Sequence, residues 1–167
     1  RRLAAGALGR VLHLAADPAG RRVATISHDG TVRLVDLDSG EITDLDVAGE
    51  GEARHIGFSP DGRYLVWSQP TLEDRLNQLR IVDLSAGTTP VPLTSGKYND
   101  HNPVFSADGK YLVFLSDRTF DPSYDNHEFG LSFTGSTRPW LIPLSAREPA
   151  PFGPSADGWR ISKDTDK

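Results

Sequence analysis

The sequence predicts an all-β fold, a partial β-propeller made of three four-stranded antiparallel blades. Three observations support this prediction: a turn motif recurs along the chain, a run of apolar residues follows each copy, and a second strand motif recurs further on. The 16 glycines and 12 prolines among 167 residues also favour short strands over helices, because both residues interrupt regular elements. Four strands repeating with a period in the forties are typical of propellers.

The turn motif fixes the repeat. Its copies place Gly20, Gly62 and Gly109 at separations of 42 and 47 residues. Ser-Pro-Asp-Gly and Ser-Ala-Asp-Gly, the second and third copies, have the composition of tight turns in which glycine takes a positive φ. The first strand of each blade ends just before this turn. The second strand follows it as a nearly continuous apolar run, as expected where neighbouring blades cover both faces.

The third and fourth strands complete each unit. The third strand recurs at 32–37, 79–84 and 139–144, and a turn of small residues follows each copy. The fourth strand is expected at 41–45, 89–93 and roughly 148–152. It is polar and contains proline, which suits an outer edge because proline cannot donate to a neighbouring strand. The predicted blades span about residues 8–46, 51–94 and 98–152.

The end of the sequence departs from the repeat. Ser155–Gly158 repeats the turn of Ser106–Gly109, but polar residues follow it instead of an apolar strand. We therefore expect residues 153–167 to form a tail or a truncated repeat. Three blades cannot close a propeller, so we expect the propeller to continue outside this segment or two copies to associate. Open blade edges favour such self-association into a homo-oligomer.

Composition argues against several classes of function. The net charge is −5 and basic residues form no run, so nucleic acid is not expected as a partner. No apolar run approaches the roughly 20 residues that cross a bilayer, so no membrane partner is expected. The absence of cysteine excludes disulfides and thiolate zinc sites. Nucleophile elbows, zinc-protease motifs and phosphate-binding glycine loops are also missing, so we expect no catalytic residue, metal or cofactor.

The blades differ most in the loop between their second and third strands. This loop grows from 27–30, through 69–78, to a long aromatic insert at 117–138. Loops of that length are usually functional or disordered. The insert either covers a blade edge, meets another domain, or contacts a peptide.

Histidines enter the first strands from the same face as these loops. In repeat register His13, His55 and Asn102 are equivalent, and so are Leu12, Arg54 and His101. Such residues could solvate a channel mouth, bond blade to blade, or touch a peptide, and a metal would require several of them to converge. The candidate contacts at the channel mouth are His55, Arg54, His101, Asp100, Arg118, Asp121, Tyr124, Asp125 and His127.

A family resemblance rests mainly on the third unit. The repeats alone resemble WD-repeat and TolB-type propellers. The stretch from Asn102 to Arg118, followed by Thr119-Phe120-Asp121-Pro122, by the insert from Tyr124 to Phe133 and by Arg138-Pro139-Trp140-Leu141, resembles the tricorn protease family. The specific likeness is to the second, seven-bladed propeller of the actinobacterial-type enzymes.

This resemblance implies a large cytoplasmic serine peptidase that cuts oligopeptides. Its catalytic groups would lie in later domains, so no residue of this chain inherits a catalytic role. The expected function is then a noncatalytic module that gates or channels peptides to the remaining domains. Two alternatives stay open, an interaction scaffold of the TolB or WD-repeat type and the propeller lid of a prolyl oligopeptidase-type enzyme.

Overall fold

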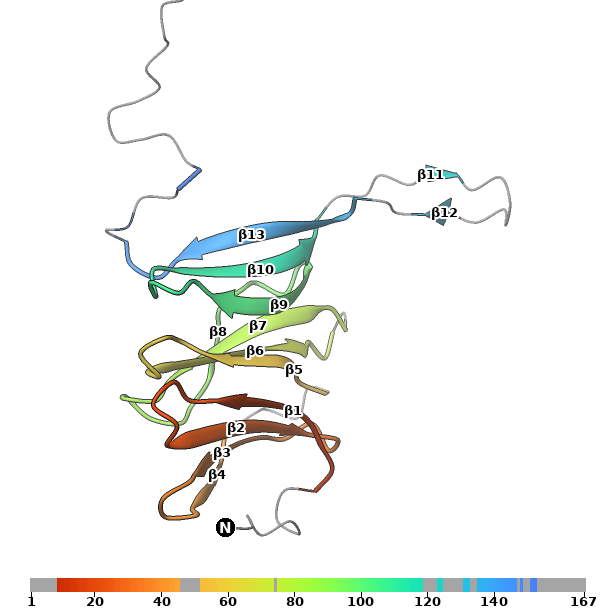
Figure 1. The fold of residues 1–167 in the computed structure, drawn as a ribbon. Coiled ribbons are helices and arrows are strands. Elements are labelled where there is room, and N and C mark those ends of the chain that lie inside the picture. Colours follow the sequence, from red (N-terminus) through yellow and green to blue (C-terminus); the bar gives the residue numbers. More distant parts are fainter. Residues whose placement is uncertain are drawn as a thin grey trace, which may run out of the picture.

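A computed structural model describes residues 9–45, 52–73, 75–118, 123–124, 131–132, 135–146, 148 and 151–152. In this part of the chain every regular element is a β-strand. Three antiparallel sheets stack in chain order, and a short hairpin projects from the third (Figure 1). The predicted all-β, partial propeller fold is confirmed. No helix in the described ranges has the length and apolar character needed to cross a membrane.

The first two sheets have four strands each, in sequential order. The first sheet comprises β1 (Val11–Ala16), β2 (Arg22–Ser27), β3 (Val32–Asp36) and β4 (Ile42–Asp44). The second comprises β5 (Arg54–Phe58), β6 (Tyr64–Pro70), β7 (Asn77–Asp83) and β8 (Val91–Pro92). The outermost strands β4 and β8 are the shortest, in keeping with their polar and proline-containing sequences.

The third sheet has the order β13-β10-β9. Its strands are β9 (Asn99–Phe105), β10 (Tyr111–Asp117) and β13 (Thr137–Pro143), and the insert adds the pair β11 (Ser123–Tyr124) and β12 (Leu131–Ser132). The fourth strand expected near 148–152 does not appear among the described residues, where Glu148 forms a bend and 151–152 a turn. Pro149 and Pro151 lack the N–H groups that a strand needs.

Two apolar clusters hold the sheets together. Between the first and second sheets lie Ala24, Ile26, Val32, Leu45, Ala53, Leu65, Trp67 and Val82. Between the second and third lie Val66, Leu79, Leu112 and Phe114. Successive side chains of a strand point to opposite faces, so Leu65 and Trp67 join one cluster while Val66 joins the other. This explains why β6 is continuously apolar in sequence.

The tight turns show why glycine recurs. Gly62 has a φ of 69° and donates its N–H to the carbonyl oxygen of Ser59 at 2.8 Å. A Cβ atom at this position would lie 2.5 Å from Oδ1 of Asp17, which belongs to the preceding sheet. Arg22 reaches across from the first sheet and donates to the Gly62 carbonyl at 2.7 Å. The turn therefore requires glycine both for its conformation and for close contact between blades.

Candidate functional site

Three histidines from three successive sheets lie in a row. His13 is on β1, His55 on β5 and His101 on β9. The ring centroids of His13 and His55 are 5.7 Å apart, and those of His55 and His101 are 6.5 Å apart. The first strands of neighbouring sheets pack on one another, which brings these rings together. We call these three residues the histidine row.

The row differs from the predicted register. The sequence aligned Asn102 with His13 and His55, and the backbone supports this alignment in part, because His55 and Asn102 share a positive φ of 51° and 52°. The ring that completes the row, however, belongs to His101. Pairing between β9 and β10 is irregular at this point, as it is near His13 in β1 and His55 in β5. Such bulges re-aim side chains by one position.

The surroundings of the row differ from ring to ring. Nδ1 of His55 lies 3.3 Å from the Ser68 hydroxyl, which donates to the Arg54 carbonyl oxygen at 3.0 Å. Nδ1 of His101 lies 2.7 Å from Oδ1 of Asn102. Burial lowers the pKa of His55, and the neighbouring positive charges of His13, His101 and Arg54 lower it further. His55 is therefore neutral at pH 7.

Arg54, the neighbour of His55 in the chain, is largely exposed to solvent. Its side chain is 56% exposed, and Nη2 lies 3.4 Å from the Glu52 carboxylate. An ion pair with this exposure contributes little to stability. Arg54 adds positive charge near His55 without being fixed in place.

Arg118 and Asp100 form a separate cluster at the start of the insert. Asp100 is 1% exposed, and one of its carboxylate oxygens lies 3.7 Å from Nη2 of Arg118. The Ser116 hydroxyl donates to Asp100 and accepts a hydrogen bond from Nε of Arg118 at 2.9 Å. The arginine thus compensates a carboxylate that is removed from water.

Aromatic rings enclose the Arg118 side chain. Its guanidinium carbon lies 3.8 Å from the ring centroid of Trp140 and 4.7 Å from that of Tyr98. Both rings are 41% exposed. Cation–π contacts of this kind restrict the motion of the guanidinium. The cluster fixes the point at which the chain leaves β10 for the insert.

A second polar cluster joins the two ends of the insert. Asp117, the last residue of β10, accepts hydrogen bonds from Thr137 at 2.5 Å and from Nδ2 of Asn99 at 2.7 Å. Oδ1 of Asn99 in turn accepts from the backbone N–H and the side-chain amide of Asn77 in the second sheet, at 3.2 and 2.7 Å. Sequence reasoning missed Asn77, Asn99 and Thr137, although all three lie at strand ends beside the long loops.

The electrostatics of Asp117 follow from these bonds. Burial on its own would raise the pKa of Asp117. The hydrogen bonds from Thr137 and Asn99, together with the nearby imidazole of His101, outweigh burial and lower it. Nε2 of His101 lies 3.9 Å from Oδ1 of Asp117, so one end of the histidine row lies beside a carboxylate.

The remaining predicted contacts belong to the insert. Asp121, Asp125 and His127 lie outside the described residues. Tyr124 is in β11, paired with Leu131 of β12. This hairpin projects away from the stacked sheets (Figure 1). Within the described residues, no group of three or more histidine, aspartate or glutamate side chains is placed to hold a metal ion.

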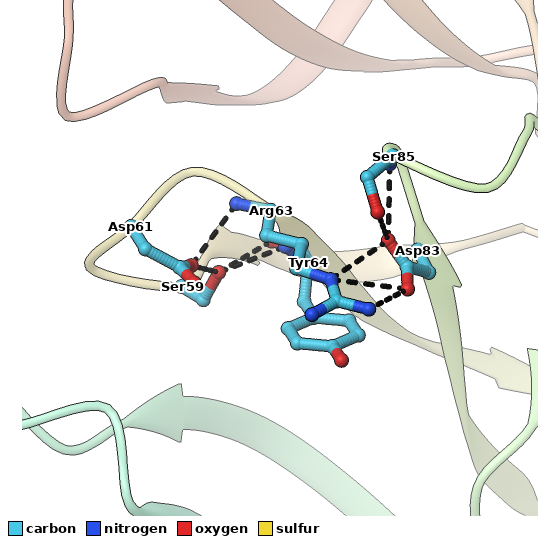
Figure 2. Close-up of polar contacts among 6 residues, drawn as sticks. All are labelled: Ser59, Asp61, Arg63, Tyr64, Asp83 and Ser85. Atoms are coloured by element: carbon cyan, nitrogen blue, oxygen red, sulfur yellow. Dashed lines mark hydrogen bonds and ion pairs between the residues drawn. The ribbon is translucent and has the colours of Figure 1, made fainter.

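The opposite end of the sheets carries the turns. Figure 2 shows that Arg63 contacts the Asp83 carboxylate through Nε and Nη2, with a shortest distance of 2.6 Å, and that Ser85 also donates to Asp83. These hydrogen bonds lower the pKa of Asp83, and the hydroxyl of Ser59 does the same for Asp61. The carboxylates here serve their own turns.

A pocket of about 460 Å³ lies between the turns of the second and third sheets. It is lined by Ser59, Pro60, Asp61, Tyr64, Ala107, Asp108, Gly109, Lys110, Leu144, Ser145 and Glu148. Lys110 and Glu148, two of its charged groups, are paired at 3.3 Å. Asp108 accepts from the hydroxyl of Ser106 at 2.6 Å and from the N–H of Lys110 at 3.1 Å. Asp108 is therefore bonded within its own turn, as Asp61 is in the second sheet.

Comparison with known families identifies the fold. All 167 residues match the family described as the tricorn protease second beta propeller domain. The chain belongs to this family. Tricorn protease homolog 1 of Streptomyces coelicolor is 49% identical to this chain over 158 residues, which are 95% of this chain and 15% of that protein. The Tricorn protease of Thermoplasma volcanium is 26% identical over 143 residues, 83% of this chain and 14% of that protein.

Solved structures support the same fold. The crystal structure of the tricorn protease matches this chain with a TM-score of 0.80 at 24% identity. The match covers 92% of this chain and 16% of that chain. TolB from Acinetobacter baumannii matches with a TM-score of 0.53 at 22% identity, over 75% of this chain and 33% of that one. The segment thus spans about one-sixth of the tricorn structure, and the TolB likeness shows a shared propeller fold alone.

Proposed function

We propose that this chain is a noncatalytic part of a serine peptidase, and that it channels peptides toward catalytic groups in other domains. The family match over the whole chain carries this proposal. The proposed partners are peptides, the remaining domains of the same protein and further copies of it, with no nucleic acid or membrane. The proposed location is the cytoplasm.

The chemistry of the described residues supports a noncatalytic role. His55 contacts Ser68, a pair that could suggest a nucleophile and its base. The Ser68 side chain is fully buried, however, and its hydroxyl donates to the Arg54 carbonyl oxygen. A serine in this state can neither reach a substrate nor transfer its proton to the imidazole. The pair therefore suits a structural role.

Placement of the variable features supports channelling. The histidine row, the Arg118 cluster and the base of the insert all lie at one end of the sheets, while uniform tight turns occupy the other. Function often concentrates in loops that a rigid scaffold positions. The insert end is therefore the proposed peptide face.

The test is to shorten the insert in the complete protein that contains this chain. Residues 120–133 are replaced by a short Gly-Ser linker, and cleavage is measured for peptides of about three and about fifteen residues. We expect cleavage of the longer peptides to change more than that of the shorter ones. A Gly-Ser insertion in the 85–88 turn, at the other end of the sheets, is the control. Equal changes for both peptide lengths would contradict channelling by the insert.

A further inference from the structure

The histidine row has the spacing of alternate residues in an extended peptide. An extended chain rises about 3.3 Å per residue, so side chains on one face repeat at about 6.6 Å. The row repeats at 5.7 and 6.5 Å between ring centroids. We propose that the histidine row binds acidic peptides in extended conformation. Acidic residues at alternate positions of the peptide would each place one carboxylate opposite one protonated imidazole. This inference rests on the proposed function, in which peptides contact the insert end, and it specifies which peptides bind there.

The charges around the row favour an anion. β1 carries no charged residue apart from His13, and the opposing strand β2 carries none near it. On β5, Arg54 adds positive charge beside His55, and the Glu52 carboxylate near it is already paired with Arg54 at 3.4 Å. On β9 and β10, the negative groups are already engaged: Asp100 with Arg118 and Ser116, and Asp117 with Thr137 and Asn99.

The contact between His101 and Asp117 limits how much His101 can contribute to peptide binding. Their 3.9 Å separation gives His101 a carboxylate of its own when it is protonated. Asp117 already accepts two hydrogen bonds, so an incoming carboxylate competes for His101 with an oxygen that is in part satisfied. We therefore expect His13 and His55 to contribute more to peptide binding than His101.

Proton linkage gives the site a pH dependence of known sign. Burial and the repulsion of His13, His101 and Arg54 lower the pKa of His55, so its ring is neutral at pH 7 and is protonated as pH falls. A carboxylate bound at the row offsets this repulsion and raises the pKa of His55, so binding takes up protons. Acidic peptides should therefore bind more tightly as the pH falls below 7.

The repeat itself supplies matched substitutions. Asn102 occupies in the third sheet the backbone conformation that His55 has in the second, with φ of 52° and 51°. Asparagine is one of the residues that tolerate this region, so His55→Asn removes the titrating ring without backbone strain. His13→Asn and His101→Gln remove the other two rings. His28, exposed in the β2–β3 turn, supplies the control His28→Asn.

The experiment measures binding to the complete protein by fluorescence anisotropy, without reference to cleavage. The probe is a labelled, end-capped Glu-Ala-Glu-Ala-Glu peptide, compared with Gln-Ala-Gln-Ala-Gln and with an equally charged Glu-Glu-Glu-Ala-Ala peptide. We expect the alternating acidic peptide to bind about three- to tenfold more tightly at pH 5.5 than at pH 7.5. The glutamine peptide should show no such gain, and the clustered acidic peptide a smaller one.

The variants decide whether the gain comes from the row. The triple variant should lose it, His13→Asn or His55→Asn alone should lose part of it, and His28→Asn should keep it. An unchanged gain in the triple variant, an equal gain for the glutamine peptide, or no binding of any probe would overturn the proposal. The single variants keep it testable if the triple variant does not fold.

The two proposals fail in distinguishable ways. If the row variants bind all probes like the parent protein while insert shortening still discriminates by peptide length, only the carboxylate site is wrong. If the row variants lose the acidic preference while insert shortening affects all lengths equally, only channelling by the insert is wrong.

Discussion

The two ends of the sheets use charged residues differently. At the turn end, Arg63 and Asp83 pair in an exposed setting and Asp61 bonds within its own turn. At the insert end, Arg118 pairs with the buried Asp100, and three histidines from different sheets meet. The comparison teaches that at the repeated end the Arg63–Asp83 pair stands in solvent and one contact, of Arg22 and Asp17 with Gly62, joins two sheets. The end that varies between blades instead buries a carboxylate and brings together side chains from three sheets.

Removal of the arginine beside the buried Asp100 should have the largest effect. Arg118→Ala leaves the Asp100 carboxylate buried without its positive partner, which costs about 3 kcal/mol. Hydrogen–deuterium exchange of segment 98–118 in the complete protein measures the loss as faster local opening. Asp100→Asn in the Arg118→Ala background should recover part of the protection. Unchanged exchange in Arg118→Ala would show that the cluster is dispensable.

A Cβ atom at the second tight turn should have the next largest effect. Gly62→Ala forces an L side chain into a φ of 69° and within 2.5 Å of Asp17 Oδ1, which costs about 2 kcal/mol. Gly40→Ala is the control, because its φ is also positive, at 79°, but no atom lies within 4 Å of the added Cβ. Exchange of segments 16–24 and 58–66 should rise more in Gly62→Ala. Equal increases in exchange in the two variants would show that the contact of Gly62 with Asp17 does not add to the cost of the substitution.

Loss of the amide at the insert base should be smaller and should depend on pH. Asn99→Ala removes a hydrogen bond to Asp117 and costs about 1 kcal/mol at pH 7. The folded-state pKa of Asp117 lies below its ordinary value, so its contribution is present above that value and is lost as pH falls through the folded pKa. Urea titrations followed by exchange of segment 111–117 should show a smaller difference between variant and parent at pH 3 than at pH 7.

Removal of the exposed arginine should have the smallest effect. Arg63→Ala breaks a bidentate contact with Asp83 that stands in solvent, where ion pairs contribute little to stability and are screened by salt. Exchange across the second sheet should stay close to that of the parent at high salt. An effect as large as that of Arg118→Ala would break the contrast between the two ends.

Most of the strands and turns could be predicted from the sequence, for a physical reason. The recurring glycine and the apolar run after it depend on local backbone geometry and on burial against both neighbours, and both leave a direct trace in residue type. Strands predicted at 32–37 and 79–84 are observed as β3 (Val32–Asp36) and β7 (Asn77–Asp83). The repeat predicted an outer strand near 148–152, but among the described residues Glu148 forms a bend and 151–152 a turn. Pro149 and Pro151 lack the N–H groups that a strand needs.

The candidate site was predicted only in part. His55 and His101 were named, but their contact depends on bulges with positive φ at His55 and Asn102, and residue type gives no direct signal of such bulges. Asp100 and Arg118 were both read as available charges, and no sequence pattern shows that one is buried against the other across 18 positions. The predicted contacts Asp121, Asp125 and His127 stay untested.

The contact between Asp17 and the turn at Gly62 constrains how such repeats can be recombined. A unit that follows the first unit must have glycine at this turn, since the Asp17 carboxylate of the first unit fills the space that a methyl group would need. The corresponding Gly109 meets only a Pro60 carbon at 4.0 Å, so its demand is conformational. In arrays shuffled from these three units, Asn at this turn should therefore be rejected in a unit that follows the first unit and accepted in a unit that follows the second.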